Sequence, residues 1–195
     1  MRMTFRALIP VPDPAEGVET TLAADRASRL DGATIGIMYN CKPNSRELLT
    51  AIADLLCERF AIRGVVGPVR TEGILLASDE QLDDMAAKCD VVLHGLGDCS
   101  SCSALSTHNG IAFERRGVPA VVVGTIPFEK SVKAMATRQG YPDFQFVKVT
   151  HPLSSLDADA IRARAREALP QVLAILGVGA TADAGELTPV GAGRA

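Results

Sequence analysis

Short apolar runs alternate with amphipathic segments from about residue 34 onward. Each short run is apolar and rich in β-branched residues, which is typical of a buried strand. Between the runs, apolar residues recur at the spacing that places them on one face of a helix. The pattern predicts strands at residues 34–39, 64–67, 91–94, 119–123 and 144–149, and helices at residues 45–60, 79–86, 102–115, 129–138 and 157–176.

Residues at the helix ends refine this prediction. Asn44 or Ser45 is expected to cap the first helix, and Asp157 to cap the last one. Gly117 stands where a glycine commonly ends a helix. Pro170 lies inside the last helix and is expected to kink or break it, because proline lacks the backbone N–H that an interior position needs.

Strands that alternate with helices predict an α/β fold with a mostly parallel sheet covered on both faces. Right-handed crossovers leave few topologies. The simplest is a single, doubly wound, five-stranded domain of the flavodoxin/Rossmann-like kind, with the strand order second-first-third-fourth-fifth. Ligands bind such sheets at the carboxyl ends of the strands where the winding reverses, here between the first and third strands. The loops at that point are residues 40–44 and 95–102.

The two ends of the chain look different from its centre. Residues 1–30 are irregular and proline-rich, and their short apolar run at residues 7–9 could form an edge strand or an arm that packs on a neighbour. Residues 31–176 form the expected domain. Residues 177–195 are rich in Gly and Ala, so we expect a disordered tail or an arm that orders on assembly. A homo-oligomer or a partner subunit is therefore expected.

Composition narrows the classes of partner. Aromatic residues make up 4% of the 195 residues, Trp is absent, and the net charge is -3. Nucleic-acid binding is therefore not expected, since it relies on aromatic platforms and clustered cations. No run approaches the roughly 20 apolar residues that span a bilayer, and the N-terminus does not resemble a secretory signal. We expect a cytoplasmic protein that acts on a small molecule, without a membrane partner.

The chain has five cysteines, and two of them, Cys99 and Cys102, form a C-x-x-C pair. Without an export signal this number favours free thiols over a disulfide framework. The pair lies on a glycine-bounded turn that leads into a helix, where unpaired N–H groups lower the pKa of a thiol. Such a pair can act as nucleophile or redox group, and it can close into a disulfide. The alternatives are two small packing residues, or half of a zinc site completed by Cys41 with His94 or His108.

The loop after the first strand carries a third thiol near the same point. Cys41 can face Cys99 across the switch point, and Lys42 could lower a thiol pKa or hold a carboxylate substrate. Residues 42–44 could equally be a simple loop and helix cap. Of the two remaining cysteines, Cys57 is expected to pack on its helix, and Cys89 suggests no role.

Three histidines could move protons near neutral pH. His108 follows Cys102 by six residues and is the candidate acid–base partner, although a histidine on a helix is commonly structural. His94 ends a predicted strand and is expected to be a core imidazole, whereas His151 follows the fifth strand. Asp98 would disfavour a thiolate at Cys99 and is expected to point away, to cap the helix or to orient a base. The expected catalytic residues are Cys99, Cys102, Cys41 and His108, and the expected substrate-binding residues are Lys42, Asn44, Asp98, Ser103, Thr125 and His151.

Several motifs together resemble the UGSC-like (CGSC) family. They stand at residues 30–36, 40–44, 97–103, 107–109 and 114–119, so the resemblance covers about residues 30–155. Some members of this family carry selenocysteine at the position of Cys99, which implies a reactive nucleophile or redox atom there. This chain has Ser100 where Gly is usual, Asn109 where Asp is usual, and Cys41 where Gly is usual. The loss of that Asp weakens a His–carboxylate pair, and the gain of Cys41 suggests a specialised substrate or a two-thiol mechanism.

Three functions fit these features. The favoured one is a thiol-dependent redox enzyme in which Cys99 attacks an oxidised or electrophilic substrate and Cys102 resolves the adduct. The second is a cofactor-independent isomerase or lyase that uses Cys41 and Cys99 as a pair, as thiol pairs act in the aspartate/glutamate racemase superfamily. The third is a non-enzymatic accessory subunit that holds a metal through thiols and histidine. No cofactor is expected for the first two.

Overall fold

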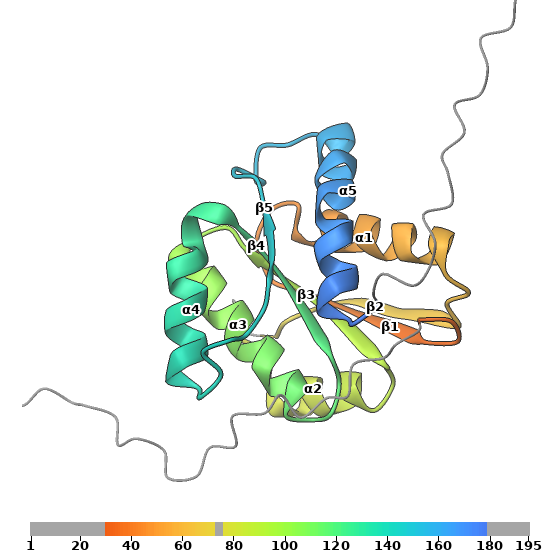
Figure 1. The fold of residues 1–195 in the computed structure, drawn as a ribbon, viewed down its shortest axis with the longest axis horizontal. Helices are drawn as coiled ribbons and strands as arrows, with labels where there is room; N and C mark the ends of the chain where they lie inside the picture. Colours follow the sequence, from red (N-terminus) through yellow and green to blue (C-terminus); the bar gives the residue numbers. More distant parts are fainter. Residues whose placement is uncertain (1–29, 73–75, 179–195) are drawn as a thin grey trace, which may run out of the picture.

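A five-stranded parallel sheet forms the centre of residues 30–72 and 76–178, which are the residues that the computed structural model describes. Its strand order is β2-β1-β3-β4-β5, which confirms the predicted doubly wound topology (Figure 1). The expected N-terminal arm and most of the expected tail lie outside the described residues. The strands are β1 Thr34–Tyr39, β2 Gly64–Arg70, β3 Val91–Gly97, β4 Ala120–Thr125 and β5 Val147–Val149.

Helices cover both faces of the sheet. One face carries α1 and α5, and the opposite face carries α2, α3 and α4 (Figure 1). Within the described part of the chain, none of these helices has the length and apolarity needed to cross a membrane. The helices are α1 Ser45–Arg59, α2 Asp79–Ala86, α3 Ser100–Glu114, α4 Glu129–Arg138 and α5 Ala158–Ile175, and a 3₁₀ turn, η1, covers Ile126–Phe128.

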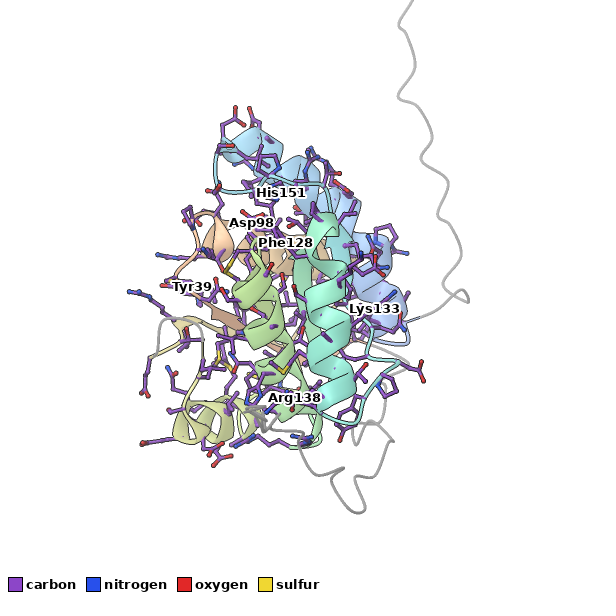
Figure 2. The ribbon with its side chains drawn as sticks, turned by 90° about the vertical axis from the view of Figure 1, so that its left-hand side faces the viewer. Tyr39, Asp98, Phe128, Lys133, Arg138 and His151 are labelled. Atoms are coloured by element: carbon purple, nitrogen blue, oxygen red, sulfur yellow. A yellow bond between two sulfur atoms is a disulfide. The ribbon has the colours of Figure 1, made fainter. Side chains whose placement is uncertain are left out.

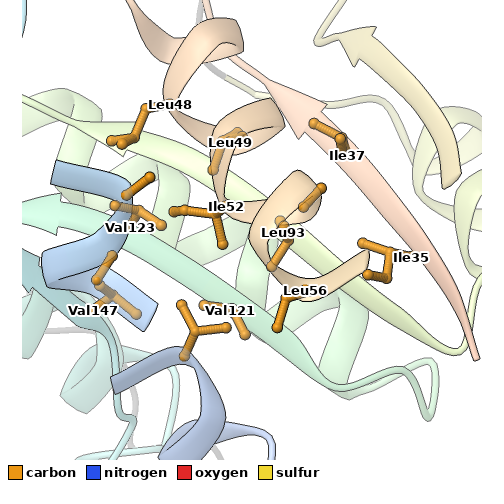
Figure 3. Close-up of a cluster of buried hydrophobic side chains, with 14 of the residues drawn as sticks. Ile35, Ile37, Leu48, Leu49, Ile52, Leu56, Leu93, Val121, Val123 and Val147 are labelled. Carbon is orange, nitrogen blue, oxygen red and sulfur yellow. The ribbon is translucent and has the colours of Figure 1, made fainter. Parts of the chain in front are cut away.

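The largest core lies between the sheet and the α1/α5 face (Figure 3). Side chains spaced three and four residues apart on α1 meet alternate residues of the central strands, because these are the faces that each element turns inward. Burying one such side chain contributes about 1.5–3 kcal/mol. The fully or nearly fully buried members include Ile35, Ile37, Leu48, Leu49, Ile52, Leu56, Leu93, Val121 and Val123.

The third strand is longer than the sequence predicts, and this difference changes the position of Cys99 relative to the helix that follows. β3 continues through Gly97, whereas a turn was expected from Gly95. Gly95 pairs with β1 and β4 on its two sides, so it belongs to the sheet. A Cβ on Gly97 would lie 2.8 Å from Ser103 Oγ, so glycine allows α3 to begin close against the strand. As a result α3 begins at Ser100 rather than near Cys102, and Cys99 becomes its N-cap.

Asn44 occupies the predicted N-cap position of α1 without a side-chain cap, and the predicted break at Pro170 does not occur. Asn44 has left-handed backbone (φ 61°) and makes no side-chain cap; its amide donates instead to the carbonyl oxygens of Leu153 and Leu156. Ser45 likewise donates to Gly95 O at 3.0 Å, inside the fold. Pro170 does not break α5, which runs through it. Pro170 is exposed, so the carbonyl that loses its N–H partner faces the solvent side of the helix.

Candidate functional site

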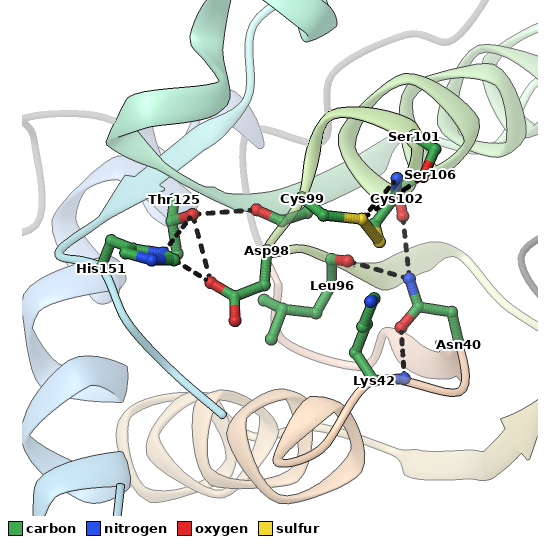
Figure 4. The surroundings of a disulfide bond; sticks show 11 residues. Asn40, Lys42, Leu96, Asp98, Cys99, Ser101, Cys102, Ser106, Thr125 and His151 are labelled. Carbon is green, nitrogen blue, oxygen red and sulfur yellow. Dashed lines mark hydrogen bonds and ion pairs between the residues drawn. A yellow bond between two sulfur atoms is a disulfide. The ribbon is translucent and has the colours of Figure 1, made fainter. Parts of the chain in front are cut away.

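A disulfide joins Cys99 and Cys102 at the junction of β3 and α3 (Figure 4). Cys99 is the N-cap of α3, and its Sγ accepts a hydrogen bond from the backbone N–H of Cys102 at 3.2 Å. Cys99 is half-buried, whereas Cys102 is fully buried. Of the two sulfur atoms, that of Cys99 is therefore the one that a partner molecule can approach. The sequence favoured free thiols; the structure shows this pair closed, with Cys41, Cys57 and Cys89 free.

Asp98, next to the disulfide, turns its carboxylate toward His151. Its Oδ1 lies 2.9 Å from His151 Nδ1, and the Asp98 side chain is only 6% exposed. Thr125 Oγ1 lies 3.3 Å from the same oxygen and 3.1 Å from Gly97 O, either of which can accept its proton. The carboxylate thus faces hydrogen-bond donors, which offsets its unfavourable effect on a Cys99 thiolate. This geometry fits the expected role of Asp98 in orienting a base.

The imidazole of His151 also contacts the aromatic ring of Phe128. The ring of Phe128 meets it edge to face, with 5.6 Å between the centroids. Figure 2 shows Asp98, Phe128 and His151 near one another at one edge of the molecule. Because η1 follows β4 and His151 follows β5, three consecutive strands of the sheet contribute to this group at their carboxyl ends. An aromatic contact and a hydrogen-bond partner together orient the ring.

Asn40 ties the loop after β1 to the helix that carries the disulfide. Its amide donates to Leu96 O at 2.9 Å and to Ser106 Oγ at 3.3 Å, and its Oδ1 accepts from the backbone N–H of Lys42 at 3.2 Å. Ser106 lies one helical turn beyond Cys102, on the same face of α3. The Cys41–Lys42 loop is therefore held beside the disulfide (Figure 4). Sequence reasoning missed Asn40; the signal was a polar residue at the very end of a buried strand.

A cavity of about 430 Å³ opens at this loop. Its volume is within the usual range for small-molecule sites. A slightly larger cavity of about 480 Å³ lies between α1 and the start of α5, but its lining contains neither cysteine nor histidine. The first cavity is therefore the better candidate for chemistry. Its lining includes Tyr39, Cys41, Lys42, Arg46, Glu47 and Arg70.

Not every predicted site residue lies with the disulfide. His108 accepts a hydrogen bond from Gln139 Nε2 at 2.9 Å, at the far end of α4, and burial together with Arg115 lowers its pKa. Ser103 is buried in the first turn of α3, where its N–H donates to Cys99 O at 2.9 Å. The structure therefore brings Lys42, Asp98, Thr125 and His151 into the surroundings of the disulfide (Figure 4) and leaves His108 outside this group.

His94 is a core imidazole, as the sequence suggested. It is fully buried; its Nδ1–H donates to Met38 O at 2.8 Å, and its Nε2 accepts from the side-chain amide of Asn109 at 3.1 Å. Burial lowers the pKa of His94 to about 4, so the ring is neutral at pH 7. The amide that replaces the usual carboxylate at residue 109 therefore pairs with His94, whereas His108 turns to Gln139.

The two remaining cysteines differ from the disulfide pair. Cys57 is exposed on α1, so the prediction that it packs is wrong; partial desolvation and Asp54 raise its pKa. Cys89 is buried and lies 3.4 Å from Met85 Sδ, and burial raises its pKa to about 11. Among residues 30–72 and 76–178, no three His, Cys, Asp or Glu side chains are grouped so that they could hold a metal ion.

The model of the UGSC family matches residues 7–178, which is most of the chain. No curated protein matches the chain.

Proposed function

Because the chain belongs to the UGSC family, we propose that it is a thiol-dependent redox enzyme in which Cys99 and Cys102 alternate between dithiol and disulfide. The observation that carries this proposal is the asymmetry of the pair. Cys99 is the accessible N-cap and accepts a hydrogen bond from a backbone N–H, whereas Cys102 is fully buried in the first turn of the helix. A thiolate at a helix N-cap is stabilised, and an accessible thiolate is the better nucleophile.

The reaction balances with a small organic disulfide as the oxidised substrate. The Cys99 thiolate attacks one substrate sulfur, forms a mixed disulfide and releases one thiolate. Cys102 then loses its proton and attacks the sulfur of Cys99, which releases the second thiolate and closes the disulfide seen here. The substrate gains two electrons and two protons, and the protein loses them. An external dithiol, itself oxidised to a disulfide, returns Cys99 and Cys102 to their thiol forms.

His151 is the residue that we assign to proton transfer. Its Nδ1 is held by Asp98 at 2.9 Å, and its side chain is 37% exposed at the edge of the sheet where Cys99 lies. Leaving thiolates need a proton near neutral pH, and imidazole is suited to exchange it. Asp98 orients the ring through its contact with Nδ1.

The test uses reduced protein and hydroxyethyl disulfide. We expect the wild-type protein to lose two thiols per chain, at Cys99 and Cys102. A Cys102→Ser variant should stop at a mixed disulfide on Cys99, seen as a mass increase, and a Cys99→Ser variant should form no adduct. Cys57→Ser is the matched control, since Cys57 is an exposed thiol on α1. Full turnover by Cys102→Ser would exclude the proposal.

The position of Cys41 favours a second candidate. Its thiol is free and exposed after β1, and Cys99 follows β3, the strand that pairs with β1. Two thiols on neighbouring strand ends could act on opposite faces of one carbon in an isomerase or lyase. That function requires Cys41 and does not require Cys102. Incorporation of solvent deuterium next to a substrate carboxylate, lost in Cys41→Ser and kept in Cys102→Ser, would establish it instead.

A further inference from the structure

The cavity at the loop after β1 is lined by several positively charged side chains. Lys42, Arg46 and Arg70 line it, and Glu47 is the one acidic residue in its lining. The three cations come from different parts of the fold: the β1–α1 loop, the first turn of α1 and the end of β2. Three positive charges against one negative stand out in a chain whose net charge is -3.

These cations are not used to hold the fold together. Across residues 30–72 and 76–178, no ion pair engages Lys42, Arg46 or Arg70. By contrast, Arg116, in the turn after α3, forms ion pairs with Asp79 and Asp83 of α2, as a structural arginine does. The first turn of α1 also faces the cavity, and the partial positive charge of a helix start adds to the same field.

Asn40 connects the cavity to the helix that carries the disulfide. Asn40 lines the cavity and donates to Ser106 Oγ on α3, one turn from Cys102. Its Oδ1 accepts from the backbone N–H of Lys42, so the loop that carries the first cation is held against that helix. Asn40 and Lys42 also lie in the surroundings of the disulfide (Figure 4), so a molecule whose charged end occupies the cavity can have its other end near Cys99.

We propose that this cavity binds the carboxylate end of the substrate, so that the enzyme acts on small disulfides that carry carboxylates. This inference rests on the proposed function and names its substrate class. Arg46 and Arg70 supply planar guanidinium groups that match a carboxylate, and Lys42, which lies in the surroundings of the disulfide (Figure 4), supplies a point charge. Cys41 lies in the same lining and contacts the bound end of the molecule.

The first test compares three disulfides of similar size and different charge. Reduced protein is given dithiodipropionate (anionic), hydroxyethyl disulfide (neutral) or cystamine (cationic). We expect kcat/KM to be about tenfold higher for the anion than for the neutral compound, and lower for the cation than for the neutral compound. The three values should converge at high salt, because salt screens the charges. Equal rates for all three would overturn the inference and leave the proposed function standing.

Substitutions of the cavity residues test whether the cavity causes the preference for the anionic disulfide. Lys42→Met, Arg46→Met and Arg70→Met should each reduce the preference for the anion, mainly through KM. Arg138→Met removes the same charge from the far end of α4, away from Asp98 and His151 (Figure 2), and should keep the full preference. Loss of the preference in Arg138→Met alone would mean that net charge, and not the cavity, selects the substrate.

Binding without redox chemistry separates the two proposals. Suberate is a carbon analogue of dithiodipropionate that cannot be reduced. We expect it to shift NMR signals of the cavity residues in the wild-type protein and not in Arg46→Met or Arg70→Met. If suberate binds and no disulfide is reduced, the proposed function fails and the anion site remains. If suberate does not bind, or if inorganic phosphate displaces it with equal potency, the carboxylate assignment fails.

Discussion

The Oδ1 atom of Asp98 lies 2.9 Å from Nδ1 of His151, across 53 residues of sequence. This contact joins the residue immediately before Cys99 to the segment that follows β5. It leaves the other ring nitrogen of His151 free to exchange protons, and Phe128 limits the rotation of the ring. A carboxylate that orients an imidazole beside a reactive group is a common catalytic arrangement.

Substitution of this pair should slow thiol–disulfide exchange without unfolding the protein. We expect His151→Gln and Asp98→Asn each to lower kcat/KM by about a hundredfold at neutral pH. Because Asp98 acts through His151, the double variant should lose little more than the more damaging single variant. Disulfide reduction is the assay, and circular dichroism checks the fold. Losses that simply add would contradict a coupled pair, and a larger loss in His108→Gln would restore His108 as the acid–base residue.

The five cysteines should differ sharply toward iodoacetamide. In the native oxidised protein, Cys41 reacts, Cys57 reacts more slowly because its pKa is raised, and buried Cys89, with a pKa of about 11, does not. After mild reduction Cys99 should become reactive, while Cys102 stays protected by burial. Peptide mass spectrometry measures the extent of alkylation at each cysteine. Alkylation of Cys102 before Cys99 would contradict the roles assigned to the two sulfurs.

Gly97→Ala should destabilise the fold and displace the disulfide. The new Cβ would lie 2.8 Å from Ser103 Oγ and 3.1 Å from backbone atoms of Ser103 and Gly124, so the start of α3 must move. We expect a loss of about 1–3 kcal/mol in urea unfolding. Gly64→Ala is the matched control, since nothing lies within 4 Å of a Cβ there. Equal stability of Gly97→Ala and the wild-type protein would show that α3 does not pack as described.

His94 should make stability depend on pH between about 6.5 and about 4. Its pKa is lowered to about 4 in the folded protein, from an ordinary value of 6.5. As the pH falls below 6.5, the unfolded chain takes up a proton at this residue and the folded protein does not, so stability decreases. Below about 4 both states are protonated and this dependence ends. The decrease amounts to about 3 kcal/mol over that range.

NMR titration of the His94 ring and urea unfolding against pH check this prediction. His94→Gln should flatten the curve in this range. Glu129 contributes in a different range: Lys133 and Lys148 lower its pKa from 4.5 to about 2, so its contribution is present above 4.5 and is lost as the pH falls toward 2. A His94 ring that titrates near 6.5 in the folded protein would contradict the buried, neutral imidazole.

The sequence by itself determined the order of the elements and the position of the thiol pair. Buried strands and amphipathic helices can be predicted from the local pattern of apolar residues, because side-chain periodicity follows directly from backbone geometry. The predicted strand order is confirmed, and it places Cys99 at the switch point between β1 and β3. The sequence did not predict the extension of β3 through Gly97, because glycines commonly indicate turns. In the structure Gly95 and Gly97 pair with β4, which comes from a later part of the chain.

Only the tertiary structure decided which residues surround the disulfide. Asp98 could not be paired with His151, nor Asn40 with Ser106, from sequence spacing, since 53 and 66 residues separate them. The same holds for the different burial of Cys99 and Cys102, which depends on how α3 packs against β3 and β4. Periodicity is a property of neighbours along the chain. A site is a property of side chains that meet only after the sheet has formed.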